Sequence, residues 1–339
     1  MTILNSRSIY YDNVNLIAQP TEVKSRKDIP EDLGRIIVSP MQSIVGLIFA
    51  CRALTLGLSV GLHRFDSTIE ERLELIKGVF ANAKGANTQE RIWVSVGLKD
   101  VEHIEKILDL GVQNILLDVA NGYMSEVLEV AAQMCRDRLQ CHGRTKSGKR
   151  IRKLMLGNIH SDSILQDYQT LSDYFGIPVY FRCGIASGSV CNTKGMTGYN
   201  RGQITEIKEC ADWIEENNSN LILVADGGIA NPACAAKAFG AGAEYVMMGG
   251  YFAHAKEAQH VVDELYKFWG GASEFQQILS KGVAERHSEG KEKDIHPDHL
   301  ENLDKLVSDL WGGISSAVSY SGYKSLEKFI GNAVFEIKQ

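Results

Sequence analysis

The chain has 339 residues, of which 44% are hydrophobic and 23% charged, and its formal net charge is −6. This is an ordinary globular composition, and the negative charge argues against general nucleic-acid or membrane-surface binding. No apolar run approaches the roughly 20 residues that span a bilayer, and the N-terminus lacks a signal-peptide layout. Seven cysteines without CxxC spacing are typical of a reducing compartment. We therefore expect a cytoplasmic protein that binds neither membranes nor nucleic acid.

Eight short apolar runs follow one another along the chain. They are continuous rather than alternating, as in parallel strands that are buried on both faces. Their spacing suits one strand and one helix each, and eight such units close into a (β/α)8 TIM barrel of the α/β class. We therefore expect a single barrel domain over residues 1–339. The runs begin near residues 35, 58, 92, 114, 153, 178, 221 and 245.

Helical patterns lie between the apolar runs. Residues 67–80 place apolar side chains at helical spacing, and residues 101–110 do the same. Asp100 stands where an N-cap of the second helix would be. Both segments are expected to cover the outside of the barrel.

Polar and glycine-rich segments follow the predicted strands, where barrels carry their active sites. "DGG" at 226–228 and "GG" at 249–250 follow the seventh and eighth runs. Backbone N–H groups can approach a phosphate closely where no Cβ intervenes, and Gly188 and Ser189 could add donors. The carboxylate of Asp226 suits a ribose diol. Together these features favour a nucleoside monophosphate site, the alternative being tight turns alone.

The loop "CGIASGSVCNTKGMTGY" follows the sixth run and surrounds Cys191 with glycine and polar residues. A cysteine that serves packing sits in an apolar setting, so this thiol is a candidate nucleophile. A thiolate adds readily to an electron-poor heteroaromatic carbon. Thr193, Glu289 and Lys291 are candidate proton handlers, whereas the other six cysteines are interpreted as packing residues.

Two further segments are strongly polar. Residues 284–298 are charged and poorly periodic, so we expect a mobile flap within 270–300, the alternative being a solvated loop. Residues 136–153 hold eight Lys/Arg and one acid before the fifth strand. This insertion is expected at the amino-terminal face of the barrel as a surface excursion, the alternative being an oligomer or polyanion contact.

These motifs resemble the IMP dehydrogenase/GMP reductase family over nearly the whole chain. "YYDNVNLIAQPTEVKSRKDI" is similar to the N-terminal segment of that family, "GSVCNT" to its catalytic-cysteine loop, and "ADGG…AKAFGAGAEYVMMGG" to its ribose and phosphate strands. Residues 64–91 leave room for one helix and not for the CBS insertion usual in the dehydrogenases. "DVANGY", "VMMGG", "RHSEGK" and the C-terminal "LWGGISSAVSYSG" are most similar to GMP reductases.

The resemblance implies an NADPH-dependent oxidoreductase that converts GMP to IMP and ammonia in purine metabolism. Residues 184–202 would form the catalytic cysteine loop and 300–339 the C-terminal segment. Cys191 would form a thioimidate with C2 of GMP, and Thr193 and Glu289 would relay the proton to the leaving ammonia. The family also suggests a homotetramer.

The same resemblance assigns binding roles. The substrate would contact Ser189, Asp226, Gly227, Gly228, Gly249, Gly250, Gly270, Gly271, Arg286, His287, Ser288 and Gly290. The cofactor would contact Ser25, Arg26, Arg64, Asp118, Val119, Ala120, Ile185, Ala186, Ser316 and Ser319. A potassium ion would be held by backbone carbonyls of Ala186, Gly188 and Cys191.

The chain departs from the family pattern near the base and the cofactor. Ala186 and Ser187 replace a glycine and a proline, and Arg64 stands where reductases usually have lysine, which alone of the two could relay a proton. The alternatives are therefore a reductase for a deoxy or modified purine monophosphate, an IMP dehydrogenase without CBS domains, and a catalytically silent nucleotide-binding relative. No motif distinguishes NADPH from NADH.

Overall fold

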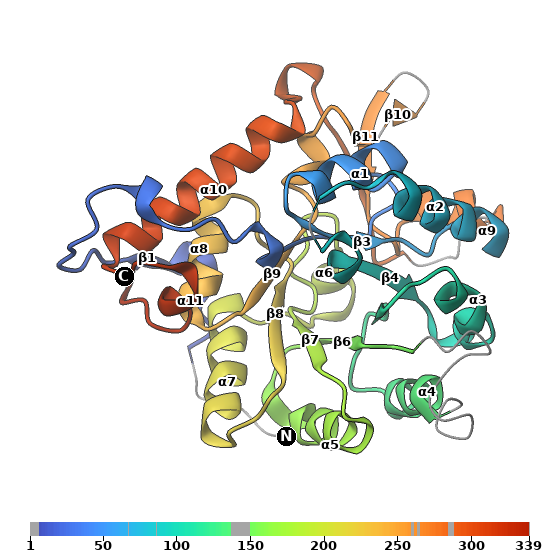
Figure 1. Ribbon diagram of the computed structural model, residues 1–339, viewed down its shortest axis with the longest axis horizontal. Helices are drawn as coiled ribbons and strands as arrows, with labels where there is room; N and C mark the ends of the chain where they lie inside the picture. Colours follow the sequence, from blue (N-terminus) through green and yellow to red (C-terminus); the bar gives the residue numbers. More distant parts are fainter. Residues whose placement is uncertain are drawn as a thin grey trace.

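A computed structural model describes residues 7–66, 68–85, 87–136, 150–258, 261–262, 265–283 and 288–338. Eight parallel strands close into a barrel with helices packed around it (Figure 1), so the (β/α)8 prediction is confirmed. Each predicted apolar run contains one barrel strand. The strands are β2 (Ile36–Val38), β3 (Ser59–Leu62), β4 (Ile92–Val96), β5 (Asn114–Leu117), β6 (Lys153–Ile159), β7 (Val179–Cys183), β8 (Ile222–Asp226) and β9 (Tyr245–Met248).

The barrel closes because its first and last strands pair with each other. Ile36 lies opposite Val246 and Val38 opposite Met248 in the β2–β9 ladder. The strands follow one another in chain order from β2 to β9, as expected when each crossover is a right-handed strand–helix unit.

Successive side chains along a strand alternate between the barrel interior and the surrounding helices. Ile37 belongs to an interior cluster, whereas its neighbours Ile36 and Val38 pack into the larger core between strands and helices. Both faces are therefore apolar, which explains the continuous runs. The interior cluster also contains Trp93, Leu116, Met155, Tyr180, Val224 and Met247.

The outer layer is formed by helices that follow the strands. Seven of the connections carry α1 (Leu47–Thr55), α2 (Ile69–Asn82), α3 (Ile104–Asp109), α4 (Ser125–Arg136), α5 (Leu165–Phe175), α7 (Gln203–Glu216) and α8 (Pro232–Ala241). Thr68 caps α2 by accepting a hydrogen bond from the Glu71 N–H. The cap predicted at Asp100 is wrong. The chain forms a 3₁₀ turn, η5 (Leu98–His103), before α3, and Asp100 instead accepts the N–H of Gly97 and a guanidinium N–H of Arg72.

Further elements precede and follow the barrel. β1 (Val14–Leu16) pairs with β13 (Phe335–Ile337), so the C-terminal end lies beside β1 in Figure 1. After β9 come β10 (Val261–Val262), β11 (Leu265–Trp269), α9 (Glu274–Lys281), β12 (Glu292–Asp294), α10 (Leu303–Tyr320) and α11 (Leu326–Phe329). The other 3₁₀ turns are η1 (Tyr11–Asn13), η2 (Arg26–Asp28), η3 (Leu33–Arg35), η4 (Thr88–Arg91), η6 (Asp162–Ile164), η7 (Phe252–His254) and η8 (Pro297–His299).

Two segments predicted as polar excursions are described in part. The expected flap 270–300 contains α9, and its strand β12 pairs with β11. Most of the basic insertion, residues 137–149, lies outside the described residues. Within the described ranges, no helix has the length and apolar character needed to cross a membrane.

Candidate active site

The loop after β7 crosses the carboxyl end of β8. The Ser187 hydroxyl donates hydrogen bonds to the backbone oxygens of Gly184, at 3.3 Å, and of Asp226, at 3.1 Å. Gly227 has φ +90°, and a Cβ there would lie 2.2 Å from the Ser187 Oγ. The "DGG" turn therefore needs glycine at this position because the loop lies directly against it. The short helix α6 (Thr193–Thr197) follows Cys191.

Cys191, Thr193 and Glu289 form one hydrogen-bonded chain. The Cys191 thiol donates to the Thr193 hydroxyl with an Sγ–Oγ1 distance of 3.2 Å, and this hydroxyl donates to the Glu289 carboxylate with an Oγ1–Oε2 distance of 2.6 Å. All three side chains are half-buried. Residues 96 positions apart in sequence therefore meet at the expected thiol. Lys291, the other candidate, meets the loop through its backbone, donating to Val190 O at 2.9 Å.

Glu289 is positioned by backbone pairing between two loops. Cys191 and Gly290 form an antiparallel bridge, and the Asn192 N–H donates to the Glu289 carbonyl. On the other side, the Gly290 N–H donates to the Ala272 carbonyl at 3.0 Å. Glu289 thus belongs to a segment that is directly paired with the cysteine loop. Ser288 also lies here, while Arg286 and His287 lie outside the described residues.

The predicted phosphate and base residues surround the same loop. A Cβ at Gly250 would lie 3.0 Å from the Ser189 Oγ, and a Cβ at Gly270 would lie 3.0 Å from the Val190 carbonyl. The other close approaches are Gly249 to Met41, Gly228 to Gln203 and Gly271 to the Phe65 ring. The structure therefore gathers these glycines at one end of the barrel, around the cysteine loop.

A row of charged side chains crosses the barrel mouth beneath this loop. The buried Arg182 guanidinium lies 3.5 Å from Asp118 and 3.4 Å from Asp226, while Arg64 pairs with Asp118 at 3.1 Å. Asn158 donates to the Asp226 carboxylate at 2.8 Å. Burial raises the pKa of Asp226, and the Arg182 charge and the Asn158 hydrogen bond act against this shift. Asp226, the residue predicted to bind the ribose, lies on β8 and is thus held in place by Asn158 of β6 and Arg182 of β7.

The predicted cofactor residues fall into two groups. Arg64, Asp118, Val119 and Ala120 follow β3 and β5, and Ile185 and Ala186 follow β7. Arg26 instead donates to the Ser316 hydroxyl of α10 at 3.4 Å, next to Ser25, and Ser319 is buried on the same helix. Because α10 packs on α8, the helix that follows β8, the second group belongs to the layer outside the barrel.

The predicted potassium ligands lie within one turn of the cysteine loop. The Gly188 carbonyl accepts the Cys191 N–H at 3.0 Å, and Ala186 has φ +62° in the left-handed region. A carbonyl oxygen has two lone pairs, so Gly188 retains one acceptor site for a cation. The loop is compatible with carbonyl ligation, and the potassium site stays a prediction.

Sequence reasoning missed Arg182 and Asn158. Both lie at carboxyl ends of strands, in "YFRCG" and "LGNIH". Tyr180 belongs to the interior cluster, so a residue two positions later on the same strand also points inward. A charged residue at an inward-facing strand position, as Arg182 is, was the signal from which this site residue could have been predicted.

The hydrogen-bonded cysteine, the glycine turns and the half-buried Asp226 carboxylate all lie at the carboxyl-terminal face of the barrel. The family model described as "IMP dehydrogenase / GMP reductase domain" matches residues 9–338, so the chain belongs to this family. It is 31% identical to the GMP reductase of Onchocerca volvulus over 98% of this chain and 92% of that protein. It is 29% identical to the GMP reductase of Caenorhabditis elegans over the same shares, and 34% identical to GMP reductase 2 of Homo sapiens over 70% of this chain and 66% of that protein.

Proposed function

We propose that the protein catalyses the NADPH-dependent reductive deamination of GMP to IMP and ammonia, as part of purine nucleotide interconversion. The single observation that carries this proposal is the hydrogen-bonded chain from Cys191 Sγ through Thr193 Oγ1 to Glu289 Oε2. It joins a nucleophile to an acid–base group in a family whose similar members are named GMP reductases.

The first step forms a bond between Cys191 Sγ and C2 of the purine and breaks the bond from C2 to the exocyclic amine. An amine leaves readily only when it is protonated, and general acid catalysis of this kind contributes roughly 10² to 10⁴ in rate. The thiol proton passes through Thr193 to Glu289 and from there to the amine, so that ammonia leaves and a thioimidate remains. Atoms and charge balance without a further reactant.

The second step reduces C2 and releases the enzyme. A nicotinamide cofactor would supply the hydride to C2 and would itself be oxidised. The electron pair of the carbon–sulfur bond returns to Cys191, which leaves as a thiolate and takes a proton from solvent to restore the thiol that lost its proton to ammonia. Arg64 and Asp118, already paired at the barrel mouth, would face the cofactor there.

The remaining residues of the site would hold the nucleotide in reach of the thiol. Asp226 would accept hydrogen bonds from the ribose hydroxyls, because its carboxylate is fixed by Arg182 and Asn158. Backbone N–H groups at Gly249 and Gly250, together with Ser189, would bind the phosphate. A homotetramer would let the Arg26–Ser316 group of one subunit reach the cofactor of another.

The test mixes the purified protein with GMP and NADPH and follows both the loss of the reduced-nicotinamide absorbance and the release of ammonia. The proposal expects equal amounts of cofactor oxidised and ammonia formed. Cys191→Ala should abolish both, whereas Cys51→Ala, which removes a half-buried thiol on α1, should leave them unchanged. Cofactor reduction with IMP and NAD⁺ would instead establish a dehydrogenase. Inactivity with GMP but turnover of a deoxy or modified purine monophosphate would show that the substrate is that nucleotide and not GMP.

A further inference from the structure

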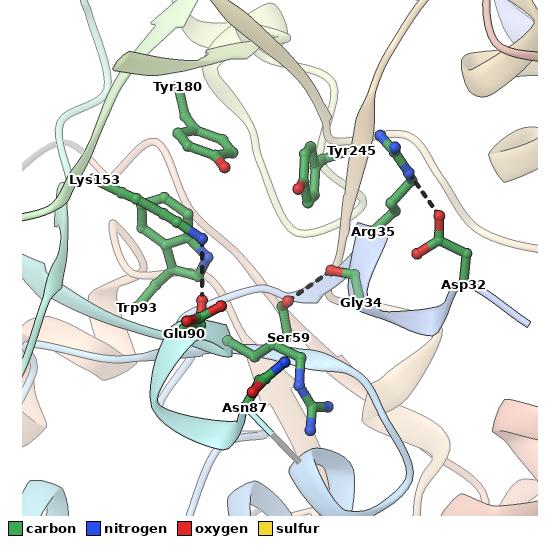
Figure 2. Close-up of a pocket in the computed structure, with 11 residues that line it drawn as sticks. Asp32, Gly34, Arg35, Ser59, Asn87, Glu90, Trp93, Lys153, Tyr180 and Tyr245 are labelled. Atoms are coloured by element: carbon green, nitrogen blue, oxygen red, sulfur yellow. Dashed lines mark hydrogen bonds and ion pairs between the residues drawn. The ribbon is translucent and has the colours of Figure 1, made fainter. Parts of the chain in front are cut away.

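A cavity opens at the amino-terminal end of the barrel, opposite the cysteine loop. It has a volume of about 310 Å³ and is lined by residues at the starts of strands, whereas the site above lies at their ends. Figure 2 shows these side chains converging from several strands. The residues used below are Arg35, Glu90, Trp93, Lys153, Tyr180 and Tyr245.

The inner wall of the cavity is aromatic. Trp93 and Tyr180 meet edge to face with ring centroids 4.8 Å apart, and Tyr180 and Tyr245 do so at 5.3 Å. In Figure 2 the phenol oxygens of the two tyrosines are turned toward each other. Such a wall offers flat apolar surface together with hydroxyl donors, the combination found in small-molecule pockets.

Three cations line this cavity, and of these Arg91 donates to the backbone carbonyls of Leu54 and Leu58. The other two differ in how their charges are compensated. Arg35 stacks over the Tyr245 ring at 5.5 Å and pairs with Asp32 at 2.8 Å. Lys153 lies 6.0 Å from the Tyr180 ring centroid and donates only a long bond, 3.5 Å, to the Glu90 carbonyl. No carboxylate of the described chain lies within ion-pair distance of Lys153. The Glu90 carboxylate attracts this ammonium only from beyond ion-pair distance, so Lys153 keeps donor capacity for a ligand.

The approach to Lys153 is also basic. Arg152 precedes it directly, Arg150 lies two residues earlier, and both are exposed. A cluster of like charges at a pocket raises the local concentration of oppositely charged ligands. These two arginines precede Lys153 in the sequence and add positive charge to the surface near it.

We propose that this cavity binds a small aromatic anion, a flat ring that carries one phosphate or carboxylate group. The anionic group would pair with the Lys153 ammonium, and the ring would lie against Trp93 and the two tyrosines. Arg35 would close the other side of the ring without giving up Asp32. This site is separate from the proposed catalytic site and does not depend on it.

The experiment titrates the full-length protein by calorimetry with phenyl phosphate and, in parallel, with benzoate. Inorganic phosphate and benzyl alcohol, each lacking one half of the ligand, are the comparison probes. At least one aromatic anion should bind at least about tenfold more tightly than both comparison probes. The ratio of the dissociation constants of phenyl phosphate and benzoate identifies the preferred anionic group. Saturating GMP should leave this binding unchanged.

Variants locate the binding. Lys153→Gln should weaken it about tenfold or more, Lys153→Arg should retain most of it, and Lys106→Gln, an exposed lysine on α3, should have no effect. A near-UV circular dichroism spectrum checks that each variant is folded. The proposal is overturned if neither aromatic anion binds at about millimolar concentration, if inorganic phosphate binds equally well, if GMP displaces the ligand, or if folded Lys153→Gln and Lys153→Arg bind alike.

Discussion

The hydroxyl of Thr193 hydrogen-bonds to both the Cys191 thiol and the Glu289 carboxylate, which makes Thr193→Val a direct perturbation of the site. Valine has nearly the same shape but replaces the hydroxyl by a methyl group. The substitution removes the 3.2 Å bond from Cys191 and the 2.6 Å bond to Glu289 at once. The thiol and the acid stay in place but lose the path between them.

The size of the effect follows from the step that the hydroxyl serves. A positioned acid contributes roughly 10² to 10⁴ in rate, which corresponds to about 3–5 kcal/mol in the activation free energy. We expect kcat to fall by that factor. KM for GMP should change little, because Thr193 lies among neither the proposed phosphate nor the proposed ribose contacts. Thr193→Ser retains the hydroxyl and should stay within about tenfold of the wild-type rate.

The assay is steady-state oxidation of NADPH at varied GMP, with Cys191→Ala as the inactive reference. Alkylation of Cys191 by iodoacetamide, read by mass spectrometry, confirms that the thiol of each variant is still accessible. If Thr193→Val kept the wild-type kcat while its thiol remained reactive, the relay through this hydroxyl would be refuted.

Three further predictions concern close packing and buried charges, the third of them at Glu206, a buried residue of α7. Gly227→Ala should lower the free energy of unfolding by at least about 1 kcal/mol, since its φ is positive and Ser187 lies in the way; an unchanged melting temperature would contradict this. Arg182→Met should cost about 3–5 kcal/mol because two carboxylates lose their buried partner, and urea unfolding measures it against Arg182→Lys. Burial raises the pKa of Glu206 to about 9, so the folded state keeps a proton that the unfolded state releases, and stability should fall from about pH 6 to about pH 8. Glu206→Gln should remove this slope in unfolding experiments, and an unaltered slope would show that other groups cause it.

The strand pattern was predictable because buried parallel strands are apolar on both faces. Every run from Ile36 to Met248 that the sequence indicates as a strand is one. The start of α3 was not predictable, because Asp100 is recruited by Arg72, a residue of another helix. A capping pattern in sequence contains no information about such a distant competitor.

The candidate site also combines features that the sequence could predict with features that it could not. Cys191 and the "DGG" turn could be identified from residue type and position after a strand. The meeting of Thr193 with Glu289 depends on a loop that returns from beyond β9, and its distance could not be derived from spacing. Arg182 was overlooked because a charged residue in a buried strand looks anomalous until its two carboxylate partners are seen.

The bridge between Cys191 and Gly290 interlocks the acid with the nucleophile. Any displacement of residues 288–291 away from the cysteine loop carries Glu289 with it and breaks the hydrogen-bonded chain at the Thr193 hydroxyl. In the proposed mechanism, a form with residues 288–291 displaced would therefore bind ligands without transferring the proton. Only the form in which this segment is paired with the cysteine loop would react. The displacement that releases the product would then also separate Glu289 from Thr193 and so stop proton transfer from the thiol.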